Sequence, residues 1–303
     1  MTMDKLAHDL GERTVELSGA TAIGPYHVQM GIPNQDAYDL ITAPGLVSLA
    51  VADGAGSLER SDEGSELAVE AGAGTVADLI LRAQGQNEIP NLPEILAEAI
   101  LEARGAVLSL DYWDQAGSTL VLAALTEESF AVATLGDSFG VVQDRSGALR
   151  LVQPPSVGEF ANITKLLTSD ESTISMCWGP LSELGGIALC SDAFEQSTLE
   201  QRVPTAGFWD RVFTMARAGK LDAAGLIGFM DGQGKIEDDA TLVSLGVTGT
   251  DIDTDGESSV AAIEERDYSL AELQELLSAE EPKAEAEVEE MLERPSGGIP
   301  RNF

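Results

Sequence analysis

Three short apolar segments follow one another near the middle of the chain, with no room for a helix between them. They are 119–125 (TLVLAAL), 130–135 (FAVATL) and 139–143 (FGVVQ), and each has the length and composition typical of a buried strand. Strands joined this directly pair antiparallel, because a parallel pair needs a long crossover connection. The segments therefore predict an antiparallel sheet and argue against a doubly wound parallel fold.

The remaining periodic segments add helices on either side of this strand-rich middle. Apolar residues recur at helical spacing in 62–84, 94–110 and 208–218, and further strands are expected at 46–52, 187–190 and 240–247. This order predicts an α+β domain built as a layered sandwich. We expect the stretch 154–185 between the strands to be irregular.

Acidic residues dominate the composition of all 303 residues. There are 52 Asp and Glu residues against 17 Lys and Arg residues, which gives a net charge of −35. Nucleic acids and anionic membranes attract clustered basic residues, so neither is expected as a partner. With no signal-like start and only two cysteines, we expect a cytoplasmic protein without a disulfide framework.

The last part of the chain has a different composition. Residues 250–303 hold 16 acidic and 4 basic residues, and they begin with a stretch rich in Gly, Ser, Thr and Asp. Leucines at helical spacing then follow Ser269, which forms a capping-box pattern with Glu272. We therefore divide the chain into a domain at 1–249 and an acidic linker and helical tail at 250–303. The tail is either a solvated appendage or a docking segment.

Several aspartates share one local setting, in which an apolar strand meets Asp and small residues. The segments are NQDAY (34–38), VADGAGS (51–57), LGDSFG (135–140), LCSDAF (189–194) and KIEDDATLV (235–243). One such Asp is usually a turn residue. Carboxylates gathered at one edge of a core would instead repel one another unless a cation neutralised them. With few bases nearby and no cluster of Cys or His, the pattern predicts a hard cation, Mg²⁺ or Mn²⁺.

Taken in order, these motifs resemble the metal-dependent protein phosphatase 2C (PPM/PP2C) family, and in particular its divergent bacterial branch with "QDA" in the first motif. The resemblance covers about residues 20–247. It implies a four-layer α/β/β/α sandwich whose two central antiparallel sheets hold two Mn²⁺ or Mg²⁺ ions at one end. It also implies hydrolysis of phosphoserine and phosphothreonine by a water shared between the two ions, which lower its pKa.

The resemblance assigns roles to individual residues. Asp53 matches the carboxylate that bridges the metals and is a candidate for both catalysis and metal binding. Gly54 matches the residue whose backbone carbonyl binds one metal. Asp192 and Asp238 match further metal ligands, and the adjacent Asp239 is included as a candidate.

Other matching residues belong to the surroundings of the two ions. Asp36 and Gln35 match the acid pair that holds the metal-bound water. Asp36 is a candidate for both catalysis and metal binding, and Gln35 is a candidate for substrate binding. Asp114 matches an aspartate associated with a third, weaker metal. Gly136 and Asp137 match a structural turn.

Three positions depart from the family pattern. Gly31 stands where an arginine commonly grips the phosphate, Ala55 stands where a histidine often follows the metal-bridging Asp, and Gln35 replaces an acid. His27 lies just upstream and is a candidate for catalysis or substrate binding, with an ordinary structural histidine as the alternative. These departures predict metal binding more firmly than fast turnover.

Three functions remain open from the sequence. The leading one is a serine/threonine phosphoprotein phosphatase that reverses a bacterial protein kinase. The second is a catalytically weak regulatory module that binds a partner and is tethered through its acidic tail. The third is a metal-dependent hydrolase of a small phosphate ester.

Overall fold

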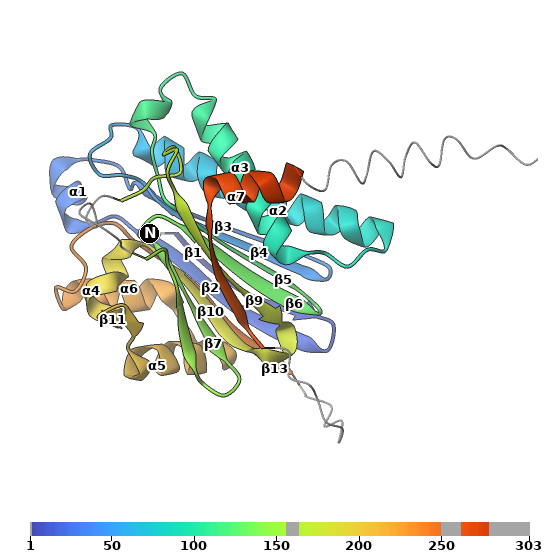
Figure 1. The fold of residues 1–303 in the computed structure, drawn as a ribbon. Helices are drawn as coiled ribbons and strands as arrows, with labels where there is room; N and C mark the ends of the chain where they lie inside the picture. The colour runs from blue at the N-terminus through green and yellow to red at the C-terminus, as the bar shows by residue number, and fades with distance from the viewer. Residues whose placement is uncertain (1, 156–163, 250–261, 279–303) are drawn as a thin grey trace, which may run out of the picture.

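Two antiparallel sheets of six strands each lie face to face, and helices cover the outer face of each sheet (Figure 1). The computed structural model describes residues 2–155, 164–249 and 262–278. The strand order is β1-β2-β13-β10-β7-β8 in the first sheet and β14-β9-β6-β5-β4-β3 in the second. All pairs in both sheets are antiparallel. The short connection between β5 and β6 joins a pair as expected, but the similarly short connection between β6 and β7 crosses from the second sheet to the first, so these two strands do not pair.

The bounds of the elements are as follows. The first sheet contains β1 (Thr2–Leu10), β2 (Arg13–Ala22), β7 (Phe139–Asp144), β8 (Leu149–Val152), β10 (Leu184–Cys190) and β13 (Ala240–Gly249). The second contains β3 (Asp36–Ala43), β4 (Leu46–Asp53), β5 (Leu120–Thr126), β6 (Ser129–Leu135), β9 (Thr173–Pro180) and β14 (Glu264–Ser269). A separate hairpin consists of β11 (Leu199–Glu200) and β12 (Val203–Pro204). The helices are α1 (Pro25–Met30), α2 (Ser61–Gln86), α3 (Leu92–Leu108), α4 (Glu195–Thr198), α5 (Ala206–Arg217), α6 (Ala223–Gly232) and α7 (Leu270–Ser278), with short 3-10 helices η1 (Trp113–Gln115), η2 (Leu181–Glu183) and η3 (Asp192–Phe194).

Strand β4 shows how the sequence builds these layers, because both of its faces are apolar. Val47, Leu49 and Val51 belong to the cluster between the two sheets. The alternate residues Leu46 and Ala50 belong to the cluster under α2 and α3. A third cluster packs α5 and α6 against the outer face of the first sheet. The predicted four-layer α/β/β/α sandwich is therefore confirmed, with three apolar layers between its four layers of backbone.

One expectation for the middle of the chain is wrong in part. Residues 154–185 were expected to be irregular, but 173–180 form β9, which pairs with β6 and β14. Its sequence TISMCWGP does not alternate between apolar and polar residues, because both faces of the strand are buried. Ile174 and Met176 pack under the helices, and Cys177 packs between the sheets. Residues 156–163 of the same stretch lie outside the described residues.

Part of the segment assigned to the acidic tail packs on the sandwich. Strand β14 pairs with β9 from Glu264↔Trp178 to Ser269↔Thr173, and Leu273 of α7 is fully buried in the cluster under α3. The predicted capping box is present, since Glu272 accepts hydrogen bonds from the backbone N–H and the hydroxyl of Ser269. The expected linker at 250–261 and the acidic segment 279–303 lie outside the described residues. No helix in the described ranges combines the length and the apolar character needed to cross a membrane.

Candidate metal centre

Four strand ends bring carboxylates to one edge of the two sheets. Asp36 is the first residue of β3 and Asp53 is the last residue of β4, and the two are direct partners in the pairing of these strands. On the other sheet, Asp192 lies just after β10, and Asp238 lies just before β13. Antiparallel neighbours place the start of one strand beside the end of its partner. The topology therefore gathers residues that are up to about 200 positions apart in the sequence.

These side chains line a cavity of about 400 Å³. Its lining includes six aspartates, one histidine and no lysine or arginine among the residues that the structure describes. The site residues that line it are His27, Gln35, Asp36, Asp53, Gly54, Asp137, Asp192, Asp238 and Asp239. The cavity therefore concentrates negative charge, in agreement with the acidic pattern at the strand ends.

The carboxylates of this cavity hold protons more tightly than ordinary aspartates. Burial, reinforced by the charges of Asp239 and Asp192, raises the pKa of Asp36 to about 8, although a hydrogen bond from Ser191 acts in the opposite direction. Burial and then the charge of Asp36 raise the pKa of Asp53 well above its usual range. Burial likewise raises the pKa of Asp192 to about 6. When these three aspartates are ionised, no lysine or arginine in the described lining of the cavity compensates their charge.

Two buried oxygen atoms test whether a cation fits here. Oε1 of Gln35 and Oδ2 of Asp36 are buried and have no hydrogen-bond partner within the described residues. The two side chains are only 4% and 6% exposed. Leaving a polar atom buried without a partner costs about 1–3 kcal/mol, so such atoms are rare and typically mark a catalytic group or the place of a bound water or ion. Oxygen atoms and carboxylates are the ligands that Mg²⁺ and Mn²⁺ prefer, and the donor set therefore fits the predicted metal.

Gly54 brings backbone rather than a side chain to the cavity. Its N–H donates to the carbonyl oxygen of Gln35 at 3.1 Å. A Cβ atom at position 54 would lie 2.6 Å from that oxygen and 2.7 Å from the carbonyl oxygen of Ser61. Only glycine fits between these two backbone segments, and this close packing fixes the position of the chain directly after Asp53.

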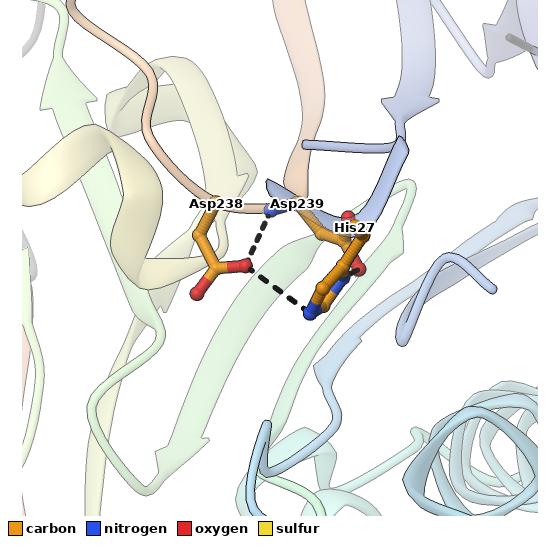
Figure 2. A group of neighbouring side chains, drawn as sticks. All are labelled: His27, Asp238 and Asp239. Atoms are coloured by element: carbon orange, nitrogen blue, oxygen red, sulfur yellow. Dashed lines mark hydrogen bonds and ion pairs between the residues drawn. The ribbon is translucent and has the colours of Figure 1, made fainter. Parts of the chain in front are cut away.

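His27 and Asp239 form a buried pair at the side of the cavity (Figure 2). Nδ1 of His27 donates to Oδ2 of Asp239 at 2.8 Å, and Nε2 of His27 lies 3.9 Å from Oδ1 of Asp238. Asp239 also accepts hydrogen bonds from the backbone N–H groups of Gly24 and Gln35, both at 2.6 Å. It therefore joins α1 and the start of β3 to the start of β13.

The structure brings together most, but not all, of the predicted site residues. Asp114 is exposed on η1 and does not line the cavity, so its suggested association with a third metal gains no support from the geometry. Two contributors were missed as site residues. The resemblance places Asp137 in a structural turn, but its side chain lines the cavity, and Ser191, for which the motifs predict no role, donates to Asp36. The sequence features that could have indicated these two residues are the Asp of the GDS motif and the position of Ser191 directly before Asp192.

Two departures from the family pattern have a clear location. Gly31 ends α1 with a left-handed backbone (φ 69°) and is exposed, so the position where an arginine was expected lies outside the cavity lining. Ala55 does line the cavity, but it offers no polar side chain. His27 is thus the one residue of the described lining whose side chain can carry a positive charge.

Comparison with known proteins agrees with this fold. The family model described as "Protein phosphatase 2C" matches residues 23–228. A curated relative, serine/threonine-protein phosphatase 3 of Escherichia coli (strain K12), is 31% identical over 163 residues, which is 52% of this chain and 63% of the relative. The chain thus spans less than two thirds of the length of that relative.

Solved structures share the architecture at low sequence identity. The serine/threonine phosphatase Stp1 from Staphylococcus aureus superposes with a TM-score of 0.55 at 15% identity, covering 81% of this chain and 98% of that chain. The catalytic domain of the serine/threonine protein phosphatase PstP, solved in complex with two manganese ions, gives a TM-score of 0.50 at 17% identity, covering 78% and 99%. At these identities the likeness establishes the fold.

Proposed function

This chain belongs to the protein phosphatase 2C family, and we propose that it is a metal-dependent protein phosphatase that releases phosphate from phosphoserine and phosphothreonine. One observation carries the proposal, namely the cavity in which six aspartates converge without a lysine or arginine in its described lining. A phosphate ester would be repelled from such a cavity unless cations first neutralised the carboxylates. The Escherichia coli relative is named as a serine/threonine-protein phosphatase, which supports the same reaction.

We assign Mn²⁺ or Mg²⁺ to this cavity. The centre would hold two ions, and a third ion would bind more weakly. Asp53, Asp192 and Asp238 would hold the ions through carboxylate oxygens, and Gly54 would contribute its backbone carbonyl. The paired manganese ions in the complex of PstP support this count, because that domain shares the fold. When bound, such ions lower the pKa of a water molecule and draw charge from the phosphoryl oxygens.

Asp36 and Gln35 would orient the attacking water. Their orphan oxygens, Oδ2 and Oε1, are the buried acceptors available to it. Ser191 donates to Asp36 and so restrains the carboxylate. Asp36 would therefore serve as the water-holding acid, with Gln35 as a neutral acceptor beside it. We find no support for a serine or cysteine nucleophile in the described lining, whose only hydroxyl groups are those of Ser57, Thr119 and Thr164.

The acidic surroundings also indicate the kind of substrate. A chain with a net charge of −35 and an aspartate-lined cavity favours phosphoproteins with basic residues around the phosphorylated side chain. We place a serine/threonine kinase of the same cell upstream of this enzyme. Both cysteines are buried and unpaired, which suits the reducing conditions of the cytoplasm.

A substrate panel tests the proposed reaction class. The full chain is assayed with Mn²⁺ against phosphothreonine peptides with basic or acidic flanks, and against nucleotides and sugar phosphates. We expect the basic phosphopeptide to give the highest kcat/KM at low salt, and a chelator to abolish its hydrolysis. Faster hydrolysis of a nucleotide or sugar phosphate would instead assign the chain to small-ester hydrolysis.

A further inference from the structure

His27 is held in a single orientation by a buried carboxylate. The hydrogen bond from Nδ1 to Oδ2 of Asp239 is 2.8 Å long, and both side chains are about 95% buried. A carboxylate only accepts hydrogen bonds, so the proton of this bond belongs to Nδ1. In the neutral ring, the lone pair is then on Nε2, the nitrogen that lies 3.9 Å from Oδ1 of Asp238 (Figure 2).

Nε2 has no hydrogen bond of its own within the described part of the chain, although the side chain lines the cavity. Asp238, its neighbour, is 64% exposed at the side chain, and its Oδ1 accepts the N–H of Asp239 at 2.9 Å. Two ligand atoms that each lie about 2.1 Å from one ion can be at most ~4.2 Å apart. The 3.9 Å separation of Nε2 and Oδ1 is within this limit.

We propose that Nε2 of His27 is a metal ligand beside Asp238, so that one ion of the centre is bound through both nitrogen and oxygen. Asp239 is then a positioning residue rather than a ligand, because its carboxylate already receives the ring N–H and two backbone N–H groups. A metal-binding histidine characteristically donates its other ring N–H to a carboxylate in this way, which fixes the ring and its tautomer.

An independent feature of the same cavity supports a bound cation. Oε1 of Gln35 and Oδ2 of Asp36 are buried acceptors without partners, and both side chains line the cavity beside His27. The backbone N–H of Gln35 donates to the same Asp239 oxygen that receives Nδ1 of His27. One carboxylate therefore fixes the imidazole and the segment that supplies the orphan oxygens.

An imidazole ligand changes which metals the centre prefers. Carboxylate and water ligands suit Mg²⁺ and Mn²⁺, whereas imidazole favours later transition metals such as Co²⁺. The inference rests on the metal centre proposed above. It predicts that loss of Nε2 weakens Co²⁺ binding by roughly tenfold or more, while Mg²⁺ binding changes much less.

The substitution His27→Asn isolates this role. An asparagine amide can still donate to Asp239 from the place of Nδ1, but it has no atom at the place of Nε2. A purely structural histidine would therefore be replaced without effect on metal binding. His8→Asn is the matched control, since the chain has only two histidines and Nε2 of His8 bonds to the carbonyl oxygen of Ala43 in β3.

Pulsed electron paramagnetic resonance of the Mn²⁺-loaded full chain gives the direct test, because it detects coupling to an imidazole ¹⁴N nucleus. We expect the coupling in the natural chain and in His8→Asn, and its loss in His27→Asn, together with the selective loss of Co²⁺ affinity by calorimetry. Bound Mn²⁺ without ¹⁴N coupling, or coupling that survives in His27→Asn, would overturn the inference and leave the proposed function intact. Failure of the natural chain to bind Mn²⁺ would overturn both.

Discussion

Asp36 and Asp53 face each other as direct partners at the end of the β3–β4 pairing, so two carboxylates lie side by side at the sheet edge. Like charges in directly opposed positions destabilise a sheet. Burial and this mutual repulsion both raise the pKa of Asp53. The repulsion between Asp36 and Asp53 therefore destabilises the metal-free fold, and a bound cation would remove this repulsion. Several measurable consequences follow.

Replacing Asp53 is expected to stabilise the metal-free protein and to remove its response to metal. Asp53→Asn relieves the repulsion from Asp36 and Asp192, so Tm in a chelator should rise. In the natural chain, Mn²⁺ at about 100 times its Kd should add about 2.7 kcal/mol of stability. Thermal unfolding with chelator and with Mn²⁺ measures both effects. Asp114→Asn, at an exposed site outside the cavity lining, is the control that should keep the Mn²⁺ shift. An equal Mn²⁺ shift in Asp53→Asn would show that the ligand has been misplaced.

The metal-free protein is expected to lose stability as the pH rises. Burial raises the pKa of Asp192 to about 6 and that of Asp36 to about 8, so the folded state binds these protons more tightly than the unfolded state does. The stabilisation is fully present only below the unfolded pKa of 3.8, and it is lost progressively as the pH rises through about 6 and then through about 8. Urea unfolding in a chelator at pH 5, 6, 7 and 8 measures the free energy of unfolding.

Asp36→Asn should make this pH dependence shallower, and saturating Mn²⁺ should also do so because metal ions displace the protons. A free energy of unfolding that rises between pH 5 and pH 8 in the chelator would contradict the assignment of raised pKa values.

Two glycines of α2 should respond oppositely to alanine. A Cβ at Gly64 would lie 1.8 Å from the carbonyl oxygen of Ala116, whereas a Cβ at Gly74 would meet nothing within 4 Å. We expect Gly64→Ala to cost about 1–3 kcal/mol through overpacking, and Gly74→Ala to gain about 0.5–1 kcal/mol of helix stability. Denaturant unfolding of the two variants tests this. Equal changes in the free energy of unfolding for the two variants would mean that α2 does not pack on the segment around Ala116 that leads into β5.

Truncation tests whether the chain after residue 249 belongs to the sandwich. Removal of everything after Gly249 takes away β14 and the buried Leu270 and Leu273 of α7. We expect a loss of about 3 kcal/mol or more, from the apolar area of two leucines alone. A chain that ends at Ser278 keeps these contacts and is the control. Unchanged stability of the shorter chain would support the independent tail that the sequence suggested.

The sequence predicts the central elements well because their apolar patterns are strong. Strands β4 and β5 are buried on both faces, and their runs of Val, Leu and Ala are visible without any structure. Strand β14 has the sequence EERDYS and buries only Tyr268, so its charges conceal a strand that is defined by pairing with β9. Local pattern cannot reveal an edge strand whose stability comes from its neighbour.

The same division applies to the candidate site. Aspartates at strand ends could be identified individually, because each follows or precedes an apolar run. The contact between His27 and Asp239 joins residues 212 positions apart, and nothing in either segment indicates it. The cavity position of Asp137 is not predictable for a related reason, since a turn motif does not show which cavity its side chain lines.

Phosphate release from a phosphothreonine peptide, followed with Mn²⁺, with Mn²⁺ plus EDTA, and with Asp53→Asn in parallel, tests the proposed function most directly. We predict release by the natural chain in Mn²⁺, none in EDTA, and a loss in Asp53→Asn that accompanies the loss of bound Mn²⁺. Release that persists in EDTA, or an inactive natural chain with Mn²⁺ bound at the cavity, would contradict a metal-dependent phosphatase.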